Sequence, residues 1–225
     1  MSKVVILIPP SEGKAPSGTG IPLGKIYQDA GVIYKRLTAY QGDLTQLYGV
    51  KGKAFLAARM ANEQLLTAPT LPAIERYSGV VYIAMGYPTL SPKAQKFFDA
   101  HVRIVSALFG LLTPDQPIPD YKLKIEKLDA AVYWKPLIAK KLAESFVIDL
   151  LPQAHQKAVF YEQGIKVDFI ISKNGKSVPA GHQGKMIKGK FIRWLCEGEI
   201  TRPEIFSEFK EDGFRFDGSN FIKKL

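Results

Sequence analysis

The chain has 225 residues and a mass of 25.0 kDa, and its 46% hydrophobic content is enough to fill a substantial core. No run approaches the roughly 18 to 20 apolar residues that a membrane span requires, and the single cysteine, Cys196, excludes an internal disulfide. The net charge of +10 favours anionic partners such as nucleic acid or phosphorylated ligands. We expect a cytoplasmic protein without a membrane partner.

The first predicted element is a central strand over residues 4–9, which ends abruptly in two prolines. A loop follows that contains Ser11, Glu12, Gly13 and Lys14. A hydroxyl, a carboxylate and an ammonium can together hold a phosphate or move a proton, although the spacing of a P-loop is absent. The alternative is a solvated loop.

Residues 30–67 are predicted to form a helical insertion, because apolar residues recur there at helical spacing. Two of its helices should meet at the turn from Gly49 to Lys53. Such a turn resembles helix-hairpin-helix modules that aim backbone N–H groups at a nucleic-acid phosphate, and Lys51, Lys53 and Arg59 would add charge. The alternative is an ordinary turn with solvated lysines.

The next segments alternate between strand and helix. We predict a strand at Val80–Met85, a helix from Ser91 to about Ala100, and a buried strand at Val102–Leu108. Another helix should start at Lys135-Pro136 and be followed by a strand at Phe146–Leu151. Alternation of this kind implies a mainly parallel sheet.

The loop between the strand ending at Leu108 and the next helix is stiffened by Gly110 and by prolines at positions 114, 117 and 119. It delivers Asp120, Tyr121, Lys122 and Lys124 directly afterwards. Open α/β sheets usually place their sites in loops that follow a strand. A proline-rich connector with solvated charges is the alternative.

Two hairpins are predicted farther on, one around Gly164 between residues 160–163 and 165–172, and one at Asn174-Gly175. We also expect a capping box from Thr201 to Glu204 and an edge strand through Phe214 and Phe216. The predicted fold class is therefore α/β, with a mixed, partly parallel sheet flanked by helices. The expected organisation is a single domain over residues 1–225.

Residues 173–193 contain six lysines or arginines and no acidic residue. Apolar residues at helical spacing should turn the cations of this segment outward. The absence of acidic partners favours an anion-binding surface over a solvated face. The candidate nucleic-acid-binding residues of this segment are His182, Lys185, Lys188 and Arg193.

No metal site or cofactor is expected, because His101, His155 and His182 stand far apart without neighbouring cysteine or histidine. His101 and His155 are interpreted as surface or capping residues. The sequence also lacks the Gly-x-Ser-x-Gly pattern of a serine hydrolase.

Taken together, several short motifs resemble those of the YaaA peroxide-stress proteins. They are Ile8 to Lys14, Tyr77 to Tyr82, Ser106 to Pro114 with Ile118 to Leu123, Tyr133-Trp134, and the tail from Lys185 to Pro203. The resemblance implies an oxidative-stress protein that limits damage from peroxide and free iron. It also implies a compact α/β fold with a basic cleft and a helix-hairpin-helix-like element thought to bind DNA.

Two departures from the family pattern matter. The family's arginine is Lys122 here, which loses bidentate phosphate geometry. A polar residue expected soon after Ile148-Asp149 is replaced by Leu151-Pro152, so a site that used this residue would be altered.

Two functions remain open from the sequence. The first is a DNA-binding stress protein that recognises the duplex by its backbone rather than by its sequence, through Lys14 and Lys122 in addition to the candidates above. The second is an enzyme acting on a nucleotide or phosphorylated small molecule, with Glu12 or Asp120 as general base and Lys14 or Lys185 stabilising negative charge. The enzyme requires Glu12, Asp120 and Lys185 to converge on one cavity.

Overall fold

The computed structural model describes residues 3–173 and 176–225. Its central sheet has five strands in the order β4-β3-β1-β6-β7. They are β1 (Lys3–Ile8), β3 (Val102–Ser106), β4 (Gly110–Leu112), β6 (Ser145–Asp149) and β7 (Gln163–Lys166). β1 pairs in parallel with β3 and β6, β7 pairs in parallel with β6, and β4 is antiparallel to β3. The predicted mixed, partly parallel sheet is confirmed.

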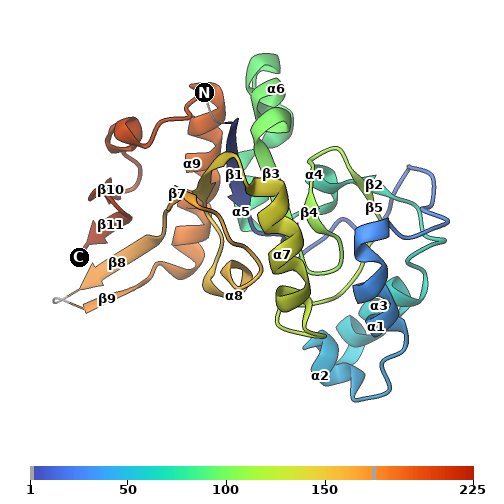
Figure 1. The fold of residues 1–225 in the computed structure, drawn as a ribbon. Coiled ribbons are helices and arrows are strands. Elements are labelled where there is room, and N and C mark those ends of the chain that lie inside the picture. The colour runs from blue at the N-terminus through green and yellow to red at the C-terminus, as the bar shows by residue number, and fades with distance from the viewer. Residues whose placement is uncertain (1–2, 174–175) are drawn as a thin grey trace.

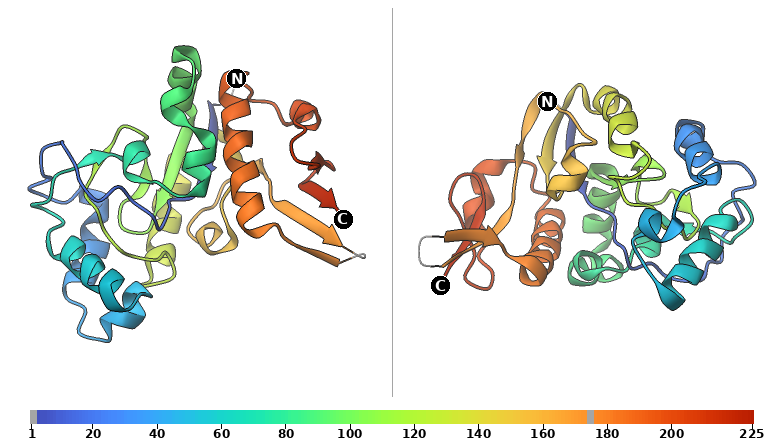
Figure 2. Two further views of the ribbon diagram at one scale, coloured as in Figure 1. Left: turned by 180° about the vertical axis from the view of Figure 1, so that it is seen from behind. Right: turned by 90° about the horizontal axis from the view of Figure 1, so that it is seen from below.

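Helices cover this sheet on both sides. Four of them are α5 (Val80–Met85), α6 (Pro92–His101), α7 (Ala130–Leu142) and α9 (Gly181–Glu197). α7 lies in front of the sheet in Figure 1, and α9 comes to the foreground when the molecule is seen from behind in Figure 2. α9 packs closely on α5 because Gly189 has no side chain: a Cβ there would lie 2.4 Å from the Val81 carbonyl oxygen.

A second sheet has four strands in the order β10-β11-β8-β9. They are β8 (Phe169–Lys173), β9 (Lys176–Pro179), β10 (Arg215–Phe216) and β11 (Phe221–Lys224). Phe191 of α9 packs against this sheet, with ring centroids 6.0 Å from Phe169 and 4.9 Å from Phe221. The segment η3 (Pro203–Glu208) completes this aromatic cluster through Phe206.

The helical insertion contains η1 (Gln28–Ala30), α1 (Gly31–Thr38), α2 (Leu44–Tyr48) and α3 (Gly52–Glu63). Asp43 caps α2 by accepting hydrogen bonds from Thr45 N at 2.7 Å and Gln46 N at 3.4 Å. Gly49 then ends α2 with a φ of +66°. α2 and α3 thus meet at the expected turn.

The remaining elements are short. They are the two-stranded sheet of β2 (Leu71–Pro72) and β5 (Pro117–Ile118), and the segments α4 (Ala73–Arg76), η2 (Tyr87–Thr89) and α8 (Gln153–Gln156). None of the helices in the described ranges is long and apolar enough to cross a membrane.

Four predicted local structures are wrong. Val80–Met85 is a helix, capped by Gly86 at a φ of +60°, rather than a strand. Gly164 lies inside β7 rather than in a hairpin turn; a Cβ there would lie 2.3 Å from the Val147 carbonyl oxygen, so glycine permits close strand pairing. The helix expected at Lys135 already begins at Ala130 and contains Pro136. The last short helix begins after Arg202 without a capping side chain.

Two other local predictions are confirmed, and one cannot be placed. Ser91 caps α6 by accepting a hydrogen bond from Ala94 N at 3.2 Å. Phe216 lies in β10 at the edge of its sheet. The turn at Asn174-Gly175 lies outside the described residues, although the flanking strands β8 and β9 pair antiparallel.

Candidate functional site

The loop that follows β1 is held against the start of α5. Ala15 N donates to Arg76 O at 2.8 Å, and Ser78 N donates to Gly13 O at 3.1 Å. The loop also approaches Gly79 closely, since a Cβ at that position would lie 2.6 Å from Ser11 Cβ. These contacts fix the backbone on both sides of Lys14.

The Lys14 ammonium is enclosed between two tyrosine rings. Its Nζ lies 4.5 Å from the centroid of Tyr121 and 5.8 Å from that of Tyr77, a cation-π arrangement. Burial, together with a smaller effect of the Lys122 charge, lowers the pKa of Lys14 to about 8, although the nearby carboxylates of Asp120 and Glu12 oppose the shift. Lys14 is therefore a cation that loses its proton near pH 8.

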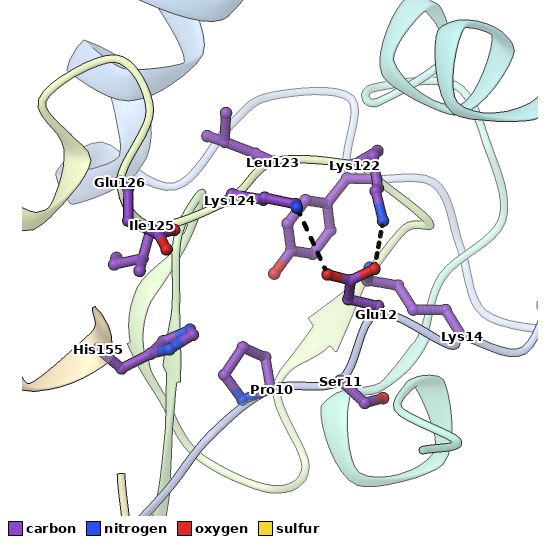
Figure 3. A pocket seen from close by; sticks show the side chains of 11 residues that line it. Pro10, Ser11, Glu12, Lys14, Lys122, Leu123, Lys124, Ile125, Glu126 and His155 are labelled. Atoms are coloured by element: carbon purple, nitrogen blue, oxygen red, sulfur yellow. Dashed lines mark hydrogen bonds and ion pairs between the residues drawn. The ribbon is translucent and has the colours of Figure 1, made fainter. Parts of the chain in front are cut away.

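Glu12 connects this loop to the segment after β5. Its carboxylate accepts a hydrogen bond from Lys122 Nζ at 3.1 Å, and the other oxygen lies 3.9 Å from Lys124 Nζ (Figure 3). The hydrogen bond from Lys122 lowers the pKa of Glu12. Because the Glu12 side chain is 71% exposed, this contact is a solvated ion pair rather than a buried one.

A chain of hydroxyl groups lies beneath Lys14. Tyr77 and Tyr121 share a hydrogen bond of 2.7 Å between their hydroxyl oxygens, and Tyr121 shares another of 2.8 Å with Ser106. Ser106 Oγ also accepts from Phe109 N at 2.9 Å. Burial raises the pKa of Tyr121 to about 12 and holds that of Tyr77 well above its usual value, so both hydroxyls stay protonated.

Two cavities open on these groups, with volumes of about 170 and 220 Å³. They share four lining residues: Glu12, Lys14, Tyr121 and Lys122. The larger one is bordered by Asp120 and by Val50 of the α2–α3 turn. Glu12 and Asp120, two of the three residues that the enzyme hypothesis requires in one cavity, therefore converge here together with Lys14.

His155 of α8 lines the smaller cavity, and Figure 3 shows its ring on the opposite side from Glu12. Its Nδ1 atom is buried and has no hydrogen-bond partner among the described residues. Burial lowers the pKa of His155 to about 4, so the imidazole is neutral at pH 7. The interpretation of His155 as a surface or capping residue is wrong, because α8 packs it into the pocket wall. His101, by contrast, hydrogen-bonds Val4 O through Nδ1 at 2.8 Å.

The α2–α3 turn lies beside the pocket. Asn62 of α3 fixes the Lys122 backbone through two hydrogen bonds, donating to its carbonyl at 2.8 Å and accepting from its N–H at 2.9 Å. Gly49 faces Lys124, since a Cβ there would lie 3.0 Å from Lys124 Nζ. Lys51 and Lys53 of the same turn are exposed.

Arg59 is engaged within its own helix. Its Nε lies 2.7 Å from a carboxylate oxygen of Glu63 on the next turn. Both side chains are more than half exposed, so the pair is weak.

The cations of residues 173–193 do not all point into solvent. Lys185 and His182 are exposed, as expected. Lys188 is turned inward and donates to Leu150 O, and burial lowers its pKa to about 8. The expectation that its ammonium faces outward is therefore wrong.

The Arg193 guanidinium is also bound to protein groups, so the prediction that it faces outward is wrong. It donates to Thr89 Oγ1 at 2.8 Å and Thr89 O at 2.9 Å, and it pairs with Glu197 at 3.2 Å. Lys190 pairs with Glu211. The segment lacks acidic residues along the chain, but folding brings acidic residues and carbonyl oxygens to its cations.

Lys185 lines a third cavity of about 540 Å³ and is absent from the lining of the two cavities that Glu12 borders. α8 lies between the two regions: His155 lines the Lys14 pocket, whereas Gln153 and Gln156 line the Lys185 cavity. Lys185 therefore does not line the cavity that Glu12, Lys14 and Asp120 share. No group of three or more potential metal ligands occurs among the described residues.

The fold and site define an α/β protein in which the central strand leads into a pocket with one enclosed lysine, bordered by a cationic helical turn. The chain belongs to the peroxide stress protein YaaA family, whose family model matches residues 4–220. This membership supports a role in oxidative stress.

Relatives of this chain carry the name UPF0246 protein, and three of them illustrate the similarity. The one from Corynebacterium glutamicum strain R is 31% identical over 216 residues, covering 87% of this chain and 86% of the relative. The one from Lactobacillus delbrueckii subsp. bulgaricus is 30% identical over 185 residues, covering 75% and 76%. The one from Streptococcus gordonii is 25% identical over 224 residues, covering 94% and 92%.

Proposed function

We propose that this protein binds duplex DNA through the phosphate backbone as part of the response to peroxide. The observation that carries the proposal is the set of cations around the Lys14 pocket: the exposed Lys51 and Lys53 on the α2–α3 turn, with the half-buried Lys124 beside them. Cations spaced along a surface suit phosphates, and no base-reading element is required.

Lys185 and His182 extend this surface beyond α8. In the view from below in Figure 2, the helical insertion, α8 and the β8–β9 pair follow one another across the molecule. A duplex lying along this side would meet both groups of cations. The contribution of Lys188 and Arg193 is expected to be small, because both are engaged with protein groups.

The test is the salt dependence of duplex binding. For three to five neutralised phosphates, log affinity should fall with log salt at a slope of about −3 to −5. The variant Lys51→Gln/Lys53→Gln should make the slope shallower by about 2, because two phosphate contacts are lost. Sequence changes in the duplex should have little effect.

The matched control is Lys96→Gln/Lys140→Gln, which removes the same charge from exposed positions on α6 and α7. It should leave the slope within about 0.5 of the parent, since long-range charge effects are screened at physiological salt. Equal effects of the two double variants would refute the proposed surface.

A second candidate function is an enzyme acting on a nucleotide or phosphorylated small molecule. It is favoured by the convergence of Glu12, Lys14 and Asp120 on one cavity. Either carboxylate would serve as general base, and Lys14 would stabilise developing negative charge. A panel of nucleotides would first identify one that the parent protein turns over. With that nucleotide, Glu12→Gln should abolish turnover while leaving the melting temperature and duplex binding unchanged. An unfolded Glu12→Gln variant would instead give this loop a structural role.

A further inference from the structure

Lys14 differs from two other partly buried lysines, Lys122 and Lys188, in what its ammonium contacts. Lys122 is held by Glu12, and Lys188 by Leu150 O. Lys14 Nζ makes no hydrogen bond or ion pair within the described residues, although it contacts the Tyr121 ring and lines both cavities. An amine that faces open space without a fixed partner is free to meet a ligand atom.

The protonation state of this amine suits bond formation. With a pKa of about 8, roughly a quarter of the Lys14 side chains are unprotonated at pH 7.5, against about one in a thousand for an ordinary lysine. Desolvated lysines of this kind act as nucleophiles toward carbonyl groups. The carboxylates of Glu12 and Asp120 border the same cavity.

The positive charges around the pocket favour a carbonyl compound that carries a phosphate next to its carbonyl group. Lys122 and Lys124 share the single carboxylate of Glu12, so they retain positive charge at the cavity edge. Lys51 and Lys53 add charge outside it. In DNA, oxidation of the sugar or loss of a base leaves an aldehyde with a phosphodiester on each side, which matches this distribution.

We infer that Lys14 forms an imine with an aldehyde that lies next to a phosphate, and that the aldehyde of a damaged DNA strand is its substrate. The choice of DNA as the source rests on the proposed function. The Lys14 nitrogen attacks the carbonyl carbon, and the C=O π electrons move to oxygen, which takes up the proton released by nitrogen. A second proton, taken up from solvent, lets this oxygen depart as water and leaves a protonated imine.

Reductive trapping tests the inference. The full chain is mixed at low salt with a duplex that carries one abasic site, with the same duplex intact, or with glyceraldehyde 3-phosphate, and sodium borohydride is added to each. The abasic duplex should yield a covalent adduct that peptide mass spectrometry places on Lys14, while the intact duplex yields none. The trapping rate should rise with pH and reach half of its maximum near pH 8.

Lys14→Arg keeps the positive charge but cannot form an imine, and it should lower trapping at least tenfold. The control Lys96→Arg, on α6, should trap as the parent does. Mapping the adduct on the parent protein needs no variant, so the inference stays testable even if Lys14→Arg does not fold.

The outcomes separate the inference from the proposed function. Adducts spread over Lys51, Lys53 and Lys124, or unchanged trapping by a folded Lys14→Arg variant, would overturn the role of Lys14. Trapping of glyceraldehyde 3-phosphate on Lys14 without trapping of the abasic duplex would overturn DNA as the source. Failure of the intact duplex to bind in the salt titration would instead reject the proposed function.

Discussion

Arg76 should be one of the most important residues for stability, although it lies outside the cavities. Its side chain is fully buried, and its guanidinium donates to four carbonyl oxygens: those of Ala15, Ser17, Pro69 and Ile118. It therefore joins the segment after Lys14 to two other parts of the chain. Burial lowers the pKa of Arg76, and the charge of Asp120 opposes that shift.

The change Arg76→Met keeps most of the side-chain volume and removes every donor. Four buried carbonyls without a partner cost at least about 1 kcal/mol each, or about 4 kcal/mol together. Arg76→Met also removes the cost of burying the guanidinium charge, which offsets part of the cost of the unpaired carbonyl groups. We therefore expect a loss of about 3 kcal/mol in the free energy of unfolding. Arg76→Lys, with a single nitrogen, should fall between the parent and Arg76→Met.

Urea denaturation monitored by circular dichroism measures these differences, and an unchanged slope with urea would show that only stability has altered. Arg59→Met is the matched control, since its guanidinium is exposed on α3. If Arg76→Met lowers the free energy of unfolding no more than Arg59→Met does, the buried hydrogen bonds of Arg76 do not have the stabilising role described.

Two further predictions concern Gly110 and Lys14. Gly110→Ala should cost about 2–5 kcal/mol in thermal unfolding, because φ is +70° and the new Cβ would lie 2.5 Å from the Trp134 ring. Gly24→Ala, at a φ of +60° with nothing within 4 Å, should cost only about 1–2 kcal/mol, and equal losses would contradict the packing argument. Lys14→Met should stabilise the fold by about 1–3 kcal/mol at pH 7. The unfolded chain binds the Lys14 proton more tightly than the folded chain, so this gain is full below pH 8 and should vanish as the pH rises to 10.5. If the stability gained by Lys14→Met grew with pH, the lowered pKa of Lys14 would be contradicted.

Three of the five strands of the central sheet were predictable because burial on both faces leaves a continuous apolar run in the sequence. β1, β3 and β6 all show this pattern, and residues 6–8 of β1 are completely buried. Val80–Met85 has the same composition but is helical. A run of six apolar residues between glycines does not by itself distinguish a strand from a helix packed on another helix.

The candidate site was only half predictable. Glu12, Lys14 and Asp120 could be found, because polar residues after a strand stand out locally. Tyr77, which flanks Lys14, and His155, which lines the smaller cavity, could not, because both come from far along the chain and resemble ordinary core or surface residues in sequence. The prediction of outward-facing cations in residues 173–193 was partly wrong for the same reason. Glu211 and the carbonyl of Thr89 become partners of Lys190 and Arg193 only in the folded chain.

The position of β1 between β3 and β6 has a consequence for synthesis of the protein. Its two neighbours are residues 102–106 and 145–149, so β1 has no partner until residue 106 has been made and lacks its second partner until residue 149 has been made. At about 5–20 residues per second, the roughly 100 residues from β1 to the end of β3 take about 5 to 20 s. During that time residues 4–8 are an exposed apolar strand suited to a chaperone. Lys14, still in water without Tyr77 or Tyr121 around it, keeps an ordinary lysine's low reactivity until the fold closes.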